Sequence, residues 1–187
     1  VTIPLALHGV IIKQDGTKIT VNIGEDEKDP VFYITDLLPH LSKEQNAKKI
    51  SEAITGEQLN ILVGSIPMDD EDIKDSVKLN ILKLLNEKYD IKEEDLASSE
   101  LEIVPAAKAR DIGFDRGLVG AYAHDDRVCA FTALEALLEM DAPKRTCVTI
   151  LADKEEIGSV GNTGMTSNYF ENLVSELIHL SGVGKAD

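Results

Sequence analysis

Apolar and polar residues in the first part of the chain follow the pattern of β-strands. Two β-rich runs, residues 5–13 and 17–23, flank Asp15 and Gly16. Such runs on either side of an Asp-Gly dipeptide predict a β-hairpin. Further short strands are predicted at 31–34, 59–63 and 101–104. Residues 1–103 are therefore expected to form an α+β region with antiparallel hairpins.

Apolar residues recur at helical spacing in the later segments, which predicts amphipathic helices. Three helices are expected: one covers residues 73–89, a second follows Asp125, and a third begins near Ser167. Ser42 with Gln45 has the form of a capping box and predicts a shorter helix. The expected apolar faces are Val77, Ile81, Leu84 and Leu85 in the first; Val128, Phe131, Leu134 and Leu138 in the second; Phe170, Leu173, Val174, Leu177 and Ile178 in the third.

Residues 146–152 form a β-branched, apolar run of the kind that is buried in a parallel sheet. The run lies between two predicted helices, so residues 104–187 are expected to be an α-β-α piece of a larger α/β sheet. One strand cannot make a sheet alone, and the other strands must come from elsewhere. The predicted fold class is α/β, with a division into domains at 1–103 and 104–187.

Composition and charge narrow the class of protein. The chain of 187 residues is 43% hydrophobic and 28% charged, as in ordinary soluble globular proteins. Its net charge of −15 disfavours nucleic acid and anionic membranes as partners. No apolar run approaches the ~20 residues that span a bilayer. Cys129 and Cys147 lie in apolar runs and are expected to be buried free thiols in a reducing cytoplasm. Val1, in place of Met, suggests a fragment.

Three carboxylates are the candidates for chemistry. Glu155 and Glu156 directly follow the predicted strand 146–152, and Asp125 precedes a predicted helix. Ligands of open α/β sheets gather at the carboxyl ends of the strands. Carboxylates that converge there suit divalent cations. Adjacent residues that leave a strand point to opposite sides, so one glutamate is expected to bind metal while the other accepts a proton from water.

The residues by themselves leave simpler interpretations open. Asp125 can be a helix N-cap that also favours the helix dipole. Glu155 and Glu156 can form a solvated acidic turn. The glycine-rich loop 158–164 matches no Walker pattern and is flanked by acids, which disfavours a phosphate site.

The histidines carry less information. His8 lies in a predicted strand and His179 near the end of a predicted helix, so both are expected to be structural. His124 adjoins Asp125 and is a candidate for supporting a metal ligand. His40 follows Pro39 at an abrupt strand end, where a role in a functional loop is plausible.

Two longer motifs resemble the aspartyl aminopeptidase family. They are Gly-Ala-Tyr-Ala-His-Asp-Asp-Arg-Val-Cys-Ala-Phe-Thr-Ala-Leu at 120–134 and Asp-Lys-Glu-Glu-Ile-Gly-Ser at 153–159. Segments 4–9, 34–41 and 161–165 are similar to the bacterial branch of that family. The resemblance covers nearly the whole chain, and the second motif is quite specific.

The resemblance implies a dizinc aminopeptidase that hydrolyses N-terminal residues, often acidic ones, from peptides. It implies two zinc ions per site, with cobalt or manganese as alternatives. By position, Asp125 matches the carboxylate that bridges the metals, Glu155 the general base and Glu156 a terminal metal ligand. His40 matches a histidine that reaches the substrate site of a neighbouring subunit. Family members assemble dimers into dodecamers, and residues 1–103 correspond roughly to the dimerisation domain.

The chain also departs from the family. An early His in a His-x-Asp motif, a later Asp and a final His cannot be placed in it. Asp125 and Glu156 alone cannot hold two zinc ions, so the chain by itself is expected to be inactive. One rival reading is a non-catalytic dimerisation module. Another is a different dizinc exopeptidase, a carboxypeptidase or deacylase.

Overall fold

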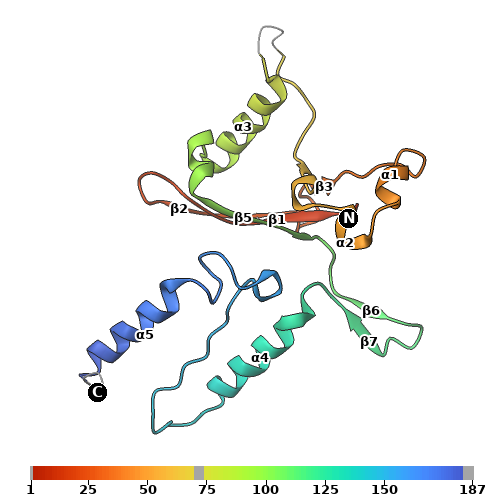
Figure 1. Ribbon diagram of the computed structural model, residues 1–187. Helices are drawn as coiled ribbons and strands as arrows, with labels where there is room; N and C mark the ends of the chain where they lie inside the picture. Colours follow the sequence, from red (N-terminus) through yellow and green to blue (C-terminus); the bar gives the residue numbers. More distant parts are fainter. Residues whose placement is uncertain (1, 70–73, 183–187) are drawn as a thin grey trace. The chain divides into compact units, whose positions relative to one another are not determined.

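A computed structural model describes residues 2–69 and 74–182. The chain divides into two compact units, Val1–Tyr122 and Ala123–Asp187. Helices and antiparallel sheets are mixed along the chain, as the predicted α/β class requires (Figure 1). The functional division at residue 103 stays a prediction. No described helix has the length and apolar character that crossing a bilayer requires.

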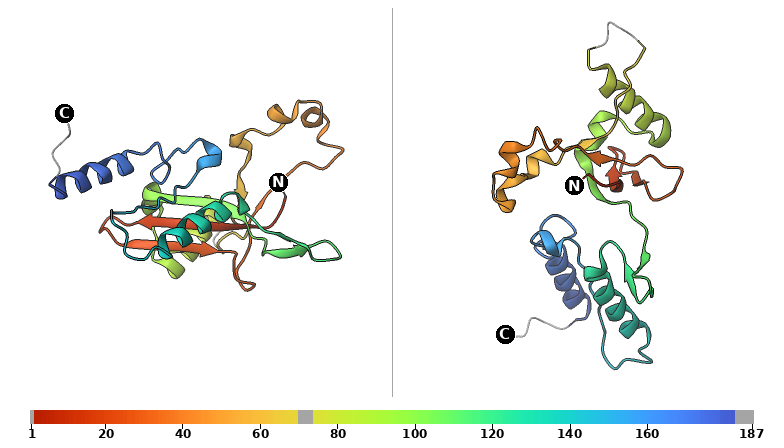
Figure 2. Two further views of the ribbon diagram at one scale, coloured as in Figure 1. Left: turned by 90° about the horizontal axis from the view of Figure 1, so that it is seen from below. Right: turned by 90° about the vertical axis from the view of Figure 1, so that its right-hand side faces the viewer.

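The N-terminal unit is built on a three-stranded antiparallel sheet in the order β2-β1-β5. The hairpin of β6 and β7 stands apart from this sheet in both views of Figure 2. The strands are β1 (Leu5–Ile12), β2 (Lys18–Ile23), β3 (Tyr33–Ile34), β4 (Ile61–Leu62), β5 (Ser99–Pro105), β6 (Arg110–Ile112) and β7 (Leu118–Gly120). The helices are α1 (Lys43–Asn46), α2 (Ile50–Ala53), η1 (Gly56–Gln58), α3 (Ser76–Tyr89) and η2 (Glu93–Ser98).

The predicted hairpin of β1 and β2 is confirmed. Gly16 adopts a φ of 83°, a conformation that favours glycine, and its N–H donates to the carbonyl of Lys13 at 2.9 Å. The N–H of Thr17 donates to Asp15 Oδ1 at 2.9 Å, as is typical of aspartate in turns. The register pairs Leu7 with Ile23, so their side chains share one face of the sheet.

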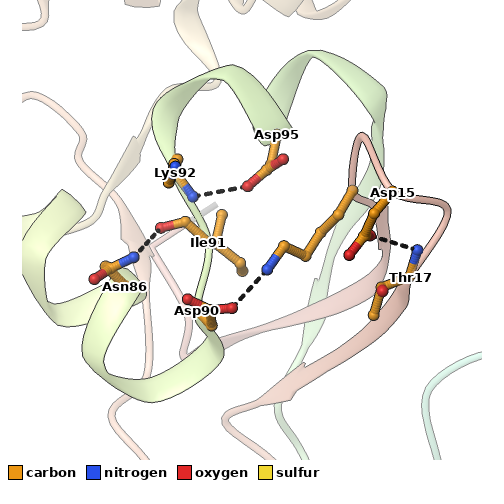
Figure 3. Close-up of polar contacts among 8 residues, drawn as sticks. Asp15, Thr17, Asn86, Asp90, Ile91, Lys92 and Asp95 are labelled. Carbon is orange, nitrogen blue, oxygen red and sulfur yellow. Dashed lines mark hydrogen bonds and ion pairs between the residues drawn. The ribbon is translucent and has the colours of Figure 1, made fainter.

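That face carries the apolar core. Ile11, Val21 and Ile23 are buried together with Ile91, which follows the end of α3. Asp90 ends α3 in the left-handed conformation, with φ 53°, and this turns Ile91 away from the helix. Lys13 Nζ donates to Asp90 Oδ2 at 2.6 Å and ties the hairpin to the end of the helix (Figure 3). The sheet and α3 therefore share one small core.

Several predicted elements of this unit are shorter than expected. The strand expected at 59–63 is reduced to β4, which pairs with β3. The helix expected at 73–89 begins at Ser76, and residue 73 lies outside the described part of the chain. Ser42 precedes α1 without capping it; its hydroxyl instead donates to the carbonyl of Pro39 at 3.1 Å. Leu84 is exposed, although it was expected on the buried face of α3.

The C-terminal unit holds α4 (His124–Leu138), the single turn η3 (Glu155–Ile157) and α5 (Asn168–Leu180). All buried hydrophobic side chains of the described residues lie in the N-terminal unit. Phe131 on α4 remains 61% exposed and Leu177 on α5 remains 47% exposed. The helices are confirmed, but most residues on their predicted inward faces are exposed, whereas Phe170 and Val174 on α5 are half-buried. An amphipathic helix buries its apolar stripe only where another layer packs on it.

The strand predicted at 146–152 is absent from the described structure, where this segment is irregular. A β-strand is held by hydrogen bonds to a neighbouring strand, and no described strand pairs with this segment. Cys147 in the segment and Cys129 on α4 are both exposed, so their predicted burial is wrong. The cause is the same: the layers that would cover these apolar runs are not formed by the described residues.

Candidate metal and catalytic residues

Glu155 and Glu156 lie in the single 3₁₀ turn η3, and both are exposed. Lys154 precedes the turn with φ 64° and Gly158 follows it with φ 93°. The N–H of Gly158 donates to the carbonyl of Glu155 at 3.0 Å, and the N–H of Ser159 donates to that of Lys154 at 2.7 Å. The glutamates point in different directions because a 3₁₀ helix turns by about 120° per residue. The sequence predicted this divergence from the alternation of side chains along a strand, but the glutamates lie in no strand.

A larger loop, residues 153–167, holds that turn; we call it the glutamate loop. Asp153 closes one end, because its Oδ2 accepts the hydroxyl of Thr163 at 3.2 Å and its Oδ1 accepts the N–H of Lys154 at 2.9 Å. Thr166 closes the other end. Its N–H and hydroxyl both donate to the carbonyl of Ser159, at 3.1 and 2.6 Å. Hydrogen bonds thus fix the path of the loop, while both glutamates remain exposed to solvent.

Gly164 allows the two sides of the glutamate loop to meet. It is the buried residue of this loop, and a Cβ built on it would lie 2.1 Å from the carbonyl oxygen of Ser159. No side chain fits at that distance. Glycine at position 164 thus permits a close approach of two backbone segments.

Asp125 lies in the first turn of α4 with non-helical dihedral angles, φ −86° and ψ 107°. The peptide bond between Asp125 and Asp126 is cis. No side-chain hydrogen bond caps the described start of α4, where Ala123 holds the N-cap position. Asp125 and Asp126 are both non-helical and lie ahead of the regular part of α4, so the interpretation of Asp125 as an acid that favours the helix dipole stays open. Asp126 is engaged elsewhere: its carboxylate accepts a hydrogen bond from the Cys129 thiol and raises the pKa of that thiol above its ordinary value.

The described residues do not assemble a complete metal site. Among residues 2–69 and 74–182, no group of three or more His, Cys, Asp or Glu side chains is placed to hold a metal ion. Asp125 and Glu156 carry oxygen donors that suit zinc, but a zinc site uses at least three protein ligands. The donors present therefore fit zinc in kind and fall short in number.

The histidines lie in different settings. His40 is exposed in a turn closed by the N–H of Leu41, which donates to the carbonyl of Leu38 at 2.8 Å. His124 is the exposed first residue of α4. His8 Nε2 lies 2.9 Å from Glu25 Oε1, which supports its structural reading. Thr163 and Thr166 were not among the predicted functional residues. Their signal in the sequence is a hydroxyl residue within, and another just after, the glycine-rich loop 158–164.

Comparisons with known proteins agree with these motifs. Residues 2–186 match the model of the family described as aminopeptidase I zinc metalloprotease (M18). A probable M18 family aminopeptidase 1 of Clostridium acetobutylicum is 60% identical over 182 residues, which are 97% of this chain and 39% of that protein. The crystal structure of an M18 family aminopeptidase from Thermotoga maritima is 49% identical with a TM-score of 0.81, over 99% of this chain and 40% of that one.

A more distant structure, the mApe1 dodecamer of S. cerevisiae, is 22% identical with a TM-score of 0.52, covering 98% of this chain and 40% of that chain. At this identity the likeness concerns the fold alone. The chain spans about two fifths of the length of the curated relatives that it matches. Because the family model matches nearly all of its residues, this chain belongs to the aminopeptidase I zinc metalloprotease (M18) family.

Proposed function

We propose that the protein containing these residues is a zinc-dependent aminopeptidase that removes N-terminal residues, acidic ones among them, from peptides. One observation carries the proposal: in a chain of this family, Glu155 and Glu156 lie side by side on a turn that hydrogen bonds close at both ends. The hydrogen bonds fix the backbone from which both exposed side chains project, and a fixed starting point for reacting groups suits catalysis.

Each carboxylate has a distinct proposed role. Glu155 accepts the proton of the attacking water and passes it to the leaving amine, the work of a general base and then a general acid. Asp125 and Glu156 each offer a carboxylate to metal, with Asp125 shared between two ions. Bound zinc would polarise the scissile carbonyl and acidify a water molecule. The remaining ligands would come from parts of the protein outside this chain.

Assembly is the second part of the proposal. His40 would enter the substrate site of a neighbouring subunit from the dimerisation domain, residues 1–103, and dimers would form a dodecamer. The exposed position of His40 in a closed turn supports a reach beyond its own subunit. The two free cysteines, with no disulfide, fit a cytoplasmic enzyme.

The substitution Glu155→Gln in the full-length protein tests the catalytic role. It keeps the shape of the side chain and removes the basic oxygen, so we expect bound zinc to be retained and kcat to fall by at least ~100-fold. Glu57→Gln is a matched control, because Glu57 is an exposed glutamate in another single 3₁₀ turn. Near-normal turnover of Glu155→Gln would refute the assignment.

Substrates distinguish this function from its rivals. An aminopeptidase cleaves a peptide with a free N-terminus and leaves the N-acetylated peptide intact. A carboxypeptidase or deacylase does not require the free N-terminus. A dimerisation module without catalytic function cleaves neither. The chain of 187 residues alone is expected to be inactive and to bind zinc weakly in a calorimetric titration. Tight binding of two ions would show that its ligand set had been misassigned.

A further inference from the structure

We propose that Thr163 and Thr166 are positioning residues for Glu155: their hydroxyls hold the glutamate loop in the shape that orients this side chain. This inference rests on the proposed function and adds residues to it. The two threonines follow the glutamates in the chain, in the second half of the loop. Their hydroxyls donate back to the first half, to Asp153 and to the carbonyl of Ser159.

The glutamate loop has few other means of staying ordered. Its large apolar residues, Ile157, Val160 and Met165, are all exposed, so packing contributes little to its shape. Left-handed backbone conformations at Lys154 and Ser159, with φ 64° and 58°, are unfavourable for residues other than glycine and persist only where surrounding interactions impose them. The cross-loop hydrogen bonds are the interactions that do so.

Asp153 links Thr163 directly to the glutamate turn. The two carboxylate oxygens of Asp153 are divided between the Thr163 hydroxyl on one side and the N–H of Lys154 on the other. The backbone repeats the connection, because the N–H of Asp153 donates to the carbonyl of Thr163 at 3.4 Å. Loss of the Thr163 hydroxyl therefore leaves Asp153, two residues before the η3 turn, tied to Thr163 only by that long backbone hydrogen bond.

Thr166 performs the same task at the end of the turn. The carbonyl of Ser159 accepts both donors of Thr166, and the N–H of Ser159 closes the glutamate turn on Lys154. The next residue, Ser167, donates its N–H to the carbonyl of Gly164 at 3.1 Å and leads into α5. Hydrogen bonds from Thr166, just ahead of α5, thus reach the residue whose N–H closes the turn that carries Glu155.

The test is a set of isosteric substitutions in the full-length, zinc-loaded protein. Thr163→Val and Thr166→Val remove the hydroxyl and keep the shape, whereas Thr163→Ser and Thr166→Ser keep the hydroxyl. We expect kcat to fall ~10- to 100-fold in the valine variants, as for a misplacement of about 1 Å, with KM nearly unchanged. The serine variants should stay close to wild type. Thr132→Val is the matched control, because the Thr132 hydroxyl bonds to carbonyls of its own helix.

A double variant shows whether the threonine acts through Glu155. The double variant Glu155→Gln, Thr163→Val should have the same kcat as Glu155→Gln alone. Displacing a side chain that has already lost its basic oxygen cannot lower the rate further. Multiplying losses would overturn the inference and assign Thr163 a merely structural role. Wild-type kcat in both valine variants, or equal losses in the serine and valine variants, would overturn it too.

Hydrogen exchange gives a readout that does not depend on activity. In metal-free full-length protein, Thr163→Val and Thr166→Val should speed amide exchange in peptides covering 153–159 and leave α4 unchanged. Unchanged exchange in those peptides would contradict the inference. Its failure is separable from that of the proposed function, because Glu155→Gln alone decides the latter.

Discussion

Replacing Ile91 with alanine removes the side-chain atoms that join α3 to the three-stranded sheet. Ile91 is 1% exposed and packs with Ile11, Val21 and Ile23, the other members of the buried cluster. It reaches that cluster because Asp90 ends the helix in the left-handed conformation and Asn86 Nδ2 donates to the carbonyl of Ile91 at 3.3 Å (Figure 3).

The expected loss follows from burial. About three carbon atoms leave the core at roughly 0.8 kcal/mol each, which is about 2.4 kcal/mol before any cavity is counted. The unfilled space adds to this, and measured Ile→Ala losses run from about 2 to 5 kcal/mol. We therefore expect the free energy of unfolding to fall by about 3 kcal/mol. Since domains are stable by about 5–15 kcal/mol, the loss is a large fraction of the total.

Urea unfolding of the chain, followed by circular dichroism, measures this loss. With a slope near 2 kcal/mol/M, the midpoint should move down by about 1.5 M with the slope unchanged. Ile50→Ala is the control, because Ile50 is 97% exposed and its truncation should change stability by less than about 0.5 kcal/mol. If the two variants unfold at the same urea concentration, Ile91 does not hold the helix on the sheet and the core is wrongly described.

Two further predictions concern the same sheet. Gly9→Ala should destabilise the chain by about 1–3 kcal/mol in the same urea assay, because the new Cβ would lie 2.0 Å from the carbonyl oxygen of Glu100 in β5; an unchanged midpoint would contradict the close approach of the two strands. Asp90→Asn should destabilise the chain at neutral pH and progressively less in acid. The Lys13 ammonium donates to the Asp90 carboxylate and lowers its pKa in the folded chain below the ordinary value of 3.8. The ion pair therefore stabilises the fold above that ordinary value, and the stabilisation is lost as the pH falls through the lower pKa of the folded state. Salt should weaken the difference, and a pH-independent gap between the two proteins would refute the ion-pair explanation.

Local patterns in the sequence identified many of the elements. The turn at Asp15 and Gly16 and the strands around it depend on neighbouring residues, so their prediction held. The helices after Asp125 and from Ser167 also follow from spacing along the chain. The family was likewise predicted from adjacent residues, through the motif at 153–159 that contains Glu155 and Glu156. Their roles, and those of Asp125 and His40, stay predictions.

The prediction for residues 146–152 failed for the opposite reason. A strand in a parallel sheet is held by hydrogen bonds to neighbouring strands. Its own apolar side chains indicate only that it can be buried. The exposed Cys147 and the uncovered face of Phe131 on α4 follow from the same dependence on other layers. Apolar pattern thus indicates the capacity for burial, whereas burial itself needs a second surface.

By itself, the sequence determined the hairpin, the helices, the acidic character and the family, because turns, periodicity and motifs are properties of adjacent residues. Tertiary structure decided that Ile91 completes the core of the sheet, that Gly164 meets Ser159, and that Thr163 and Thr166 close the loop around the glutamates. These contacts join segments whose separation in space depends on the path of the chain between them. Hydrogen bonds act over about 3 Å, so only the folded chain shows which donors reach which acceptors.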